Sequence, residues 1–390
     1  MRECVIIDGV RSPNSRAHNE KGWFRALRPD EVLTKVYDGL FARNSKVKPE
    51  DIESVFVGCA NITGMQNDIG RLAWLAGGFP ESVPTNTLTM QCPSGMAATQ
   101  HAARAIMCGE GDAYIAAGVE DMQKVFMAMH MDFPPRLANR YNILDLPMGN
   151  TAEKVAEVYK VNRTDMETMA FWSNKKADAA TKAGKFKGEI IPMEGLKDDG
   201  TPFMVETDQW IRGDVSMESM ATMKTPFKPD GVVTAATSSP LTIGAAAILL
   251  MERSKADKLG LSYSIKYEAG ALAGCDPTVM GIGPVPAVQR LLARTGKKVS
   301  DIAVWEFNEA FASQALACVR ELGIAQNAPF DNVNIWGGAL ALGHPLGESG
   351  CRILVTLHSI MKNELKDAKY GVASLCGAFG NAGATMLSRV

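Results

Sequence analysis

The sequence lacks the cysteine spacing of a zinc site and of a disulfide framework. Its eight cysteines are scattered, without a CxxC pair or a histidine-rich cluster beside them. It also lacks an excess of either charge, because 41 basic residues stand against 43 acidic ones and the net charge is −2. A nucleic-acid-binding protein would normally carry a basic excess. We therefore expect a reduced protein with no metal site and no nucleic acid among its partners.

Long hydrophobic runs are missing as well. The longest, residues 243–251, is about half of the ~20 apolar residues that a membrane-spanning helix needs. The N-terminal stretch MRECVIIDGVRS contains only a short apolar run that Asp8 interrupts, unlike a secretory signal peptide. These absences predict a soluble, cytoplasmic protein without a membrane span.

Short strand-like runs alternate with longer segments of helical spacing along the chain, which predicts a layered α/β fold with buried strands. The predicted strands cover residues 4–8, 54–58, 85–90, 113–118, 263–272, 303–308, 333–338, 370–377 and 383–390. The predicted helices cover residues 31–44, 66–78, 94–109, 286–294, a segment ending at 322, and 348–362.

Two short matches indicate that one unit occurs twice. Asp51–Ile52 and Asp301–Ile302 are 250 positions apart, and each precedes a predicted strand. Ser94–Gly95 and Ser349–Gly350 are 255 positions apart, and each lies at the start of a predicted helix. Matches at nearly one offset suggest a duplication. Two packed copies would place their corresponding loops around one shared cleft.

The segment between the two halves has a different composition. It is rich in methionine and carries charged, proline-containing loops, with one clear helix at Thr164–Lys182 that begins with the capping pattern TDME. We expect an inserted lobe over the cleft that carries ligand contacts. The predicted division is an N-terminal half at 1–118 plus about 246–262, an inserted lobe at 119–245, and a C-terminal half at 263–390.

A cysteine lies at one strand-to-helix junction, in the segment TMQCPSGMAATQ. Cys92 precedes Pro93, which suits the first position of a helix because it has no N–H to satisfy. A thiol at a helix N-terminus meets free N–H groups and the positive end of the dipole, which favour its thiolate. Cys92 is thus a candidate nucleophile, while a small buried core residue is the alternative.

Three other segments carry candidate reactive groups. His344 lies in GGALALGHPLG between a glycine and a proline, and Asn308 lies in NEAFA where a strand ends. Cys376 ends a strand and precedes a glycine-rich turn, whose N–H groups could bind an oxyanion. Taken singly, the histidine could simply pack in its turn and the asparagine could simply cap a helix.

Together these segments resemble the thiolase family over the whole chain. MQCPSGM, NEAFA, GGALALGHPLG and CGAFGNAGA resemble its four reactive motifs, and MGNTAE, KPDGVVTAATSS and GCDPTVMGIGPVPA resemble further segments. The resemblance is closest to bacterial degradative 3-ketoacyl-CoA thiolases. It implies a duplicated α/β/α/β/α layered fold with an inserted loop domain.

The resemblance also implies a two-step acyl transfer. Cys92 would give its proton to His344 and attack the keto carbon of a 3-ketoacyl-CoA. Cleavage would leave an acyl-cysteine and the enolate of acetyl-CoA, which Cys376 would protonate before CoA takes the acyl group. One oxyanion site would consist of His344 and a water held by Asn308, and the other of the backbone N–H groups of Cys92 and Ala378.

Coenzyme A is implied as a substrate, with no tightly bound cofactor and no metal. The family pattern gives candidate polar and aromatic contacts to CoA at Arg212, Ser219, Phe227 and Ser239, and apolar walls at Met148, Met280 and Phe311. Family members are homodimers or homotetramers, and degradative ones can join a hydratase/dehydrogenase subunit. We expect a homo-oligomer, with such a subunit as a further partner.

Several positions depart from the family pattern. Pro93, Ala236 and Pro240 replace small residues, and Ala378, Phe379 and Asn381 replace the more usual glycine, glycine and glutamine. The four reactive groups are retained. Four methionines between Met122 and Met131 favour substrates longer than acetoacetyl-CoA, since methionine adapts to varied apolar chains, whereas Phe379 could narrow the pocket.

Four alternatives remain open. An acetyl-CoA acetyltransferase acting on acetoacetyl-CoA differs only in chain-length preference. A ketoacyl synthase would lack Cys376, and a sterol-carrier-type thiolase homologue would carry histidine in place of Asn308. A non-catalytic acyl-CoA binder should have lost at least one reactive group. Since none is lost, an acyltransferase active in fatty-acid β-oxidation is the favoured prediction.

Overall fold

The computed structural model describes residues 2–390, and all of its described strands except one two-stranded hairpin belong to one hydrogen-bonded sheet. The path runs β4 (Thr85–Leu88), β3 (Ser54–Gly58), β5 (Ala113–Asp121), β8 (Thr242–Glu252), β1 (Cys4–Arg11), β9 (Ile265–Gly274), β12 (Asn381–Arg389), β11 (Tyr370–Gly377) and β10 (Val304–Phe307), with β2 (Ser15–Arg16) on β8. Only Val5 and Ile6 of β1 pair with β9, so the N-terminal and C-terminal strand sets meet at a narrow junction.

The pairing directions repeat between the two halves. In the N-terminal half β3 is parallel to β4 and β5, and β8 is antiparallel to β5 and β1. In the C-terminal half β10 is parallel to β11, and β12 is antiparallel to β11 and β9. The short 3₁₀ turns before β3 and β10 also match, because Asp51 and Asp301 accept the backbone N–H of Lys48 and Lys298 at 2.9 and 2.8 Å. The predicted duplication is confirmed.

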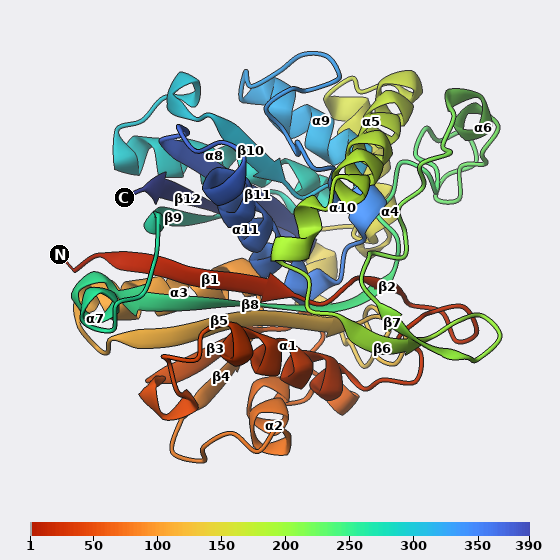
Figure 1. Cartoon of the computed structure of the whole chain (residues 1–390). Helices are drawn as coiled ribbons and strands as arrows, with labels where there is room; N and C mark the ends of the chain where they lie inside the picture. The colour runs from red at the N-terminus through yellow and green to blue at the C-terminus, as the bar shows by residue number, and fades with distance from the viewer. Residues whose placement is uncertain (1) are drawn as a thin grey trace.

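Helices form three layers around the strands (Figure 1). α3 (Ser94–Cys108) and α11 (Leu346–Asn363) pack on each other and lie between the two strand sets. α1 (Pro29–Arg43) and α2 (Ile69–Ala76) cover the N-terminal strands, at the bottom of Figure 1, and α8 (Pro284–Thr295) covers the C-terminal strands with α9 (Ala312–Glu321) beside it. The predicted α/β/α/β/α layering is therefore correct.

The two repeated Ser–Gly pairs meet where α3 crosses α11. A Cβ on Gly95 would lie 2.7 Å from the Gly347 carbonyl oxygen, and one on Gly350 would lie 2.4 Å from the Met96 backbone nitrogen. Real Cβ atoms do not approach backbone this closely, so both positions require glycine. This contact brings together the N-terminal ends of the two central helices, where the candidate cysteine and histidine lie.

The segment between β5 and β8 lies on the right of Figure 1, and two of its helices pack against α9. It contains α4 (Met148–Val158), α5 (Arg163–Lys182), the hairpin of β6 (Met193–Leu196) and β7 (Pro202–Val205), and α6 (Met217–Ala221). The helix predicted at Thr164–Lys182 is thus present as α5, whereas α4 was not predicted. The division at residues 119 and 245 stays a prediction. Over residues 2–390, no helix is long and apolar enough to cross a membrane.

The strand predicted at 333–338 is wrong. Only Val333 forms an isolated bridge, parallel to Trp305. The chain turns at Asn334, whose φ is 46°, and the side-chain amide of Asn334 accepts from the Phe307 N–H and donates to the Phe307 carbonyl, both at 2.8 Å. A side chain thus takes the two hydrogen bonds that a fifth strand would have made. The bridge occupies the place that β4 has in the other half.

Other boundaries shift by a few residues. The strand predicted to end at 90 ends at Leu88, and the strand predicted to end at 118 continues to Asp121. The helix predicted at 66–78 is a 3₁₀ turn (Gly64–Gln66) followed by α2. Short elements complete the chain: α7 (Arg253–Lys258), α10 (Ala339–Leu342), and 3₁₀ turns at Pro49–Asp51, Pro135–Asn139, Ile143–Asp145, Lys185–Gly188, Pro277–Ile282, Val299–Asp301 and Ala378–Gly380.

Candidate active site

Cys92 lies in a tight turn between β4 and α3. The preceding residue, Gln91, has φ 60°, a left-handed conformation that a non-glycine side chain rarely takes. Ser94 holds this turn, because its hydroxyl donates to the Gln91 carbonyl and accepts the Met90 N–H at 2.8 Å. The turn places Cys92 before the first residue of α3, with 7% of its surface exposed.

Burial, rather than the helix dipole, dominates the acidity of this thiol. Removal from water raises the pKa of Cys92 to about 12, while the backbone N–H groups of Ala378 and of Cys92 itself act in the opposite direction. The sequence argument considered only the groups that favour the thiolate, and burial outweighs them, so the structure favours a neutral thiol at rest. The Ala378 amide nevertheless faces the sulfur, as a donor for a developing negative charge should.

Cys376 lies near the end of β11 and is fully buried. Burial and the neighbouring Cys92 raise the pKa of the Cys376 thiol well above its usual value. The next residue, Gly377, lies directly against Pro93, since a Cβ there would be 2.4 Å from the Pro93 Cδ. The turns that follow β4 and β11 therefore touch, and the two cysteines are close enough to influence each other's charge.

Asn308 and His344 form a second contact at the site. The Asn308 Nδ2 lies 3.4 Å from His344 Nε2 and 3.5 Å from Nδ1, with both side chains buried. Asn308 follows β10, where its backbone N–H donates to Ser374 on β11 at 3.0 Å. The backbone N–H of His344 donates to the Thr242 hydroxyl at 3.2 Å, and this bond attaches the histidine to β8.

Ser349 is the hydrogen-bond partner of His344 Nδ1. The Ser349 hydroxyl lies 2.6 Å from His344 Nδ1 and 2.8 Å from the Pro345 carbonyl oxygen. In the tautomer that leaves Nε2 unprotonated, Nδ1 donates to the Ser349 oxygen and the hydroxyl donates to Pro345. Burial and then the nearby Arg352 guanidinium lower the pKa of His344 to about 3, so the imidazole is neutral and can act as a base at Nε2.

Sequence reasoning missed two residues that support these groups. Ser349 was noted only as part of a repeated pair. Glu120 falls at the start of the predicted inserted lobe at 119–245, yet its buried carboxylate accepts the N–H groups of Ala60 at 2.7 Å and Gly347 at 2.9 Å. It thereby ties the loop after β3 to the start of α11. The available signal was the acidic residue at the end of the apolar run 113–119, since a buried carboxylate needs hydrogen-bond partners.

The glutamate of the NEAFA motif has a structural place. Glu309 is buried and accepts hydrogen bonds from Ser173 at 2.6 Å, Asn334 at 2.7 Å and the Leu340 N–H at 3.2 Å. Glu309 thus connects three parts of the chain: α5, the turn at Asn334, and α10. The last of these, α10, comes directly before the turn that carries His344. Its neighbour Asn308 is the residue of the motif that reaches the candidate site.

Most of the candidate CoA residues gather along one wall beside Asn308. The ring of Phe227 packs edge-to-face on Phe311, with centroids 6.1 Å apart, and covers Gly149, next to Met148 at the start of α4. The Ser239 N–H donates to the Ala310 carbonyl at 3.0 Å, so this serine borders the same wall. Met280 is almost fully buried.

The other two candidates lie outside this wall. Arg212 is exposed, and its guanidinium lies 5.8 Å from the Trp210 ring centroid. In the described part of the chain Arg212 has no carboxylate within ion-pair distance. Ser219 is exposed on α6, where its hydroxyl donates to the Ser216 carbonyl at 2.8 Å. The structure thus separates an apolar wall from an exposed polar rim.

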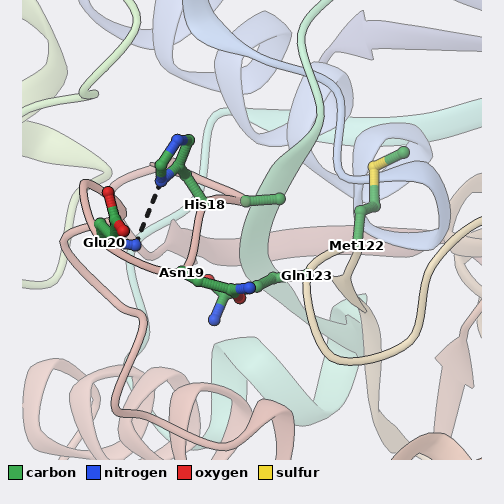
Figure 2. A pocket seen from close by; sticks show the side chains of 6 residues that line it. His18, Asn19, Glu20, Met122 and Gln123 are labelled. Atoms are coloured by element: carbon green, nitrogen blue, oxygen red, sulfur yellow. Dashed lines mark hydrogen bonds between the residues drawn. The ribbon is translucent and has the colours of Figure 1, made fainter.

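A surface cavity of about 410 Å³ lies elsewhere (Figure 2). It is lined by Ala17, His18, Asn19, Glu20, Met122 and Gln123, none of which is a candidate catalytic residue. His18 Nδ1 already accepts the Glu20 N–H at 3.1 Å. Within residues 2–390, no group of three or more His, Cys, Asp and Glu side chains could hold a metal ion.

The site can therefore perform acyl transfer on a thiol. It combines a buried cysteine at a helix N-terminus with an amide N–H facing it, a second cysteine, and a neutral histidine with a free Nε2 beside an asparagine. These are the parts that formation and breakdown of a thioester require. The class indicated by fold and site is a cysteine-dependent acyltransferase on a duplicated α/β scaffold.

Comparison with known proteins identifies the family. The N-terminal domain of thiolase matches residues 4–254, and the C-terminal domain of thiolase matches residues 262–389. Proteins named 3-ketoacyl-CoA thiolase from Shewanella frigidimarina and Shewanella baltica are each 43% identical over 392 aligned positions, covering 100% of both chains. The crystal structure of the Bacillus anthracis acetyl-CoA acetyltransferase superposes with a TM-score of 0.88 at 31% identity, covering 100% of this chain and 99% of the other. The chain belongs to the thiolase family.

Proposed function

We propose that this thiolase cleaves 3-ketoacyl-CoA with free CoA, giving acetyl-CoA and an acyl-CoA shortened by two carbons. The relatives that match the whole chain at 43% identity carry the name 3-ketoacyl-CoA thiolase. The observation that carries the proposal is the contact between the two turns, which holds Cys92 against the Ala378 amide and next to Cys376. The reverse reaction is a Claisen condensation of two acyl-CoA molecules.

In the first step Cys92 attacks the keto carbon while its proton moves to His344 Nε2. Both groups are neutral at rest, so the charge separates only as the carbon–sulfur bond forms. The oxyanion on the former keto oxygen is stabilised by the N–H groups of Cys92 and Ala378. The bond between the α and β carbons then breaks, leaving an acyl-Cys92 thioester and the enolate of acetyl-CoA.

In the second step Cys376 protonates the enolate, and acetyl-CoA leaves. Until then, two hydrogen-bond donors stabilise the enolate oxygen: His344 and a water molecule bound by Asn308. Free CoA then attacks the acyl-Cys92 thioester and gives its proton to the Cys376 thiolate. Cys92 recovers its own proton from His344, which returns every group to its starting state.

We place coenzyme A along the wall of Phe227, Phe311 and Met148, where Ser239 would bond the pantetheine arm. The exposed Arg212 and Ser219 suit the nucleotide end, because a cation without a carboxylate partner attracts phosphate. Met280 completes the apolar lining near the reacting carbons. No metal and no tightly bound cofactor take part in this scheme.

The setting proposed is cytoplasmic fatty-acid β-oxidation by a homodimer or homotetramer. β4 ends the strand path with no described strand on its outer side, and neighbouring α2 exposes Leu72 and Leu75. A second copy could cover this edge, since natural proteins seldom leave an apolar strand edge open. A hydratase/dehydrogenase subunit is the further partner proposed.

The second candidate is an acetyl-CoA acetyltransferase, favoured by the likeness to the Bacillus anthracis enzyme. Steady-state thiolysis of 3-ketoacyl-CoAs from four carbons upward, with free CoA, separates the two. We expect kcat/KM to increase beyond acetoacetyl-CoA, because the segment Met122–Met131 offers four adaptable apolar side chains. A maximum at four carbons with a steep loss beyond it would establish the second candidate instead.

A further inference from the structure

The turn after the second cysteine contains an aromatic residue in a conformation that suits glycine. Phe379 has φ 62° and ψ 22°, in the left-handed region, and Gly380 follows with φ 85°. A side chain at positive φ places its Cβ close to backbone, and a bulky residue there is uncommon. Phenylalanine at this place must therefore be stabilised by its surroundings.

The backbone of this turn leaves little room for movement. Ala378, immediately before Phe379, directs its N–H toward Cys92, and Gly377 lies against Pro93 of the nucleophile turn. On the other side, the Gly380 carbonyl accepts the Cys275 N–H at 2.9 Å. A small rotation at residue 379 would therefore redirect the Ala378 N–H relative to the Cys92 sulfur.

The ring of Phe379 meets a second aromatic ring from a distant part of the chain. Phe133 packs edge-to-face on it, with centroids 5.9 Å apart and an interplanar angle of 82°. Such a pair is attractive beyond the apolar surface that it buries. Phe133 lies in the methionine-rich connection after β5, and both rings are half-buried. The connection is thus attached to the turn at the residue that carries the strain.

The other left-handed residue of the site is held differently. Gln91 before Cys92 is fixed by the Ser94 hydroxyl, which bonds both sides of that turn. In the turn of Phe379, the side-chain hydrogen bond is the longer one from Asn381 Nδ2 to the Ala378 carbonyl, at 3.5 Å. The aromatic contact takes the place that a strong hydroxyl bond has in the nucleophile turn.

We propose that Phe133 is a positioning residue, which holds Phe379 in its left-handed conformation and thereby keeps the Ala378 N–H directed at Cys92. This inference depends on the proposed role of that N–H as an oxyanion donor. Phe133 itself touches no reacting atom. Its effect should therefore be the same for every acyl chain and should disappear when residue 379 no longer carries strain.

A double-mutant cycle tests the proposal. The full-length variants Phe133→Ala, Phe379→Gly and their combination are assayed for thiolysis of a four-carbon and a longer 3-ketoacyl-CoA. We expect Phe133→Ala to lower kcat about tenfold on both substrates with little change in KM, because a donor that moves by a fraction of an ångström loses much of its effect. In the Phe379→Gly background the same change should cost less than about twofold, since glycine takes this conformation freely.

Two further variants separate positioning from general damage. Phe133→Tyr keeps the ring and should restore most of the activity. Phe126→Ala removes another ring of the same connection, 59% exposed, and should leave kcat unchanged. If Phe133→Ala raises KM, or lowers activity on one chain length only, Phe133 lines the acyl site. If Phe133→Ala lowers kcat equally in the wild-type and Phe379→Gly backgrounds, Phe133 acts independently of Phe379. Either result would overturn the proposal.

A readout without an acyl substrate keeps this test distinct from that of the proposed function. The Ala378 N–H also stabilises the free Cys92 thiolate, so Phe133→Ala should slow alkylation of Cys92 by iodoacetamide at pH 9, and Phe379→Gly should cancel the difference. If the wild-type protein cleaves no 3-ketoacyl-CoA, the proposed function fails while the alkylation cycle still reports on the pair. An unchanged alkylation rate in Phe133→Ala would contradict the positioning role.

Discussion

The N-terminal ends of α3 and α11 occupy corresponding places in the two halves, yet they present opposite chemistry. Cys92 must become an anion to react, whereas His344 must stay neutral in order to accept a proton. The positive end of a helix favours the thiolate and disfavours the imidazolium, so the same field assists ionisation of Cys92 and keeps His344 neutral until the proton is transferred. Burial then raises the thiol pKa to about 12, and burial with Arg352 lowers the histidine pKa to about 3. The pair is neutral at rest.

A serine braces the reactive residue in each half. Ser94 fixes the backbone of the turn before Cys92, and Ser349 fixes the orientation of the His344 ring through Nδ1. Both serines are fully buried, and each precedes a glycine at the crossing of the two helices. The duplicated serine therefore has two uses. In the N-terminal half it fixes the backbone before Cys92, and in the C-terminal half it contacts the ring of His344.

The largest effect should come from removing the nucleophile. Cys92→Ala is expected to lower thiolysis and condensation by at least ~10⁴-fold, because no other group can carry the acyl chain. Cys108→Ala at the exposed, opposite end of α3 is the matched control and should retain full activity. Steady-state assays in both directions measure this. Substantial turnover by Cys92→Ala would exclude the acyl-cysteine route.

A proton-exchange experiment should distinguish the role of Cys376 from that of Cys92. Cys376→Ala is expected to slow exchange of the α-protons of acetyl-CoA with deuterated water by about 10³-fold, since the general base is gone. Acylation of Cys92 should persist. Exchange at the wild-type rate would leave Cys376 with a structural role only.

The two serine braces should fail in different ways. Ser349→Ala leaves Nδ1 of His344 without its acceptor, and we expect kcat to fall roughly 10- to 100-fold with partial recovery in Ser349→Thr. Ser94→Ala loosens the nucleophile turn and should also reduce thermal stability. Calorimetry gives the melting temperature of each variant, and steady-state kinetics gives its kcat. Wild-type kcat in Ser349→Ala would contradict the tautomer assignment.

The pH dependence of Cys92 alkylation, which needs no substitution, reports on the resting protonation state of the pair. Because burial raises the thiol pKa to about 12, the thiolate fraction should increase about tenfold per pH unit from pH 6 to 9 without a plateau. The exposed Cys108 serves as the reference in the same digest. A plateau near neutral pH would instead indicate a resting thiolate–imidazolium pair between Cys92 and His344.

Local patterns in the sequence predicted the layers, the duplication and the motifs, because each depends on neighbouring residues. The strand predicted at 333–338 was wrong because the Asn334 side chain bonds Phe307, which lies 27 positions away. Glu120 was missed for the same reason, since its partner Gly347 lies 227 positions along the chain. Hydrogen bonds between such distant residues produce no periodic pattern in the local sequence from which they could be predicted.

The balance that sets the pKa of Cys92 could be predicted only in part from the sequence, for a related reason. The helix dipole at Cys92 can be inferred from the sequence, but the extent of burial depends on the turn after Cys376, which comes from the other half of the chain. The same contact brings the Ala378 N–H to the sulfur. The effect of the helix dipole on the pKa of Cys92 depends on neighbouring residues only. The effect of burial depends on which distant segments exclude water from the thiol in the folded protein.

The most direct test of the central claim is the location of the acyl group during turnover. The full-length protein is incubated with a 3-ketoacyl-CoA in the absence of free CoA, quenched with acid, digested and analysed by mass spectrometry. One acyl mass should appear on the peptide that contains Cys92, and it should be removed when CoA is added before the quench. An acyl group on Cys376 or Cys108, with Cys92 unmodified, would contradict the assignment of Cys92 as the nucleophile.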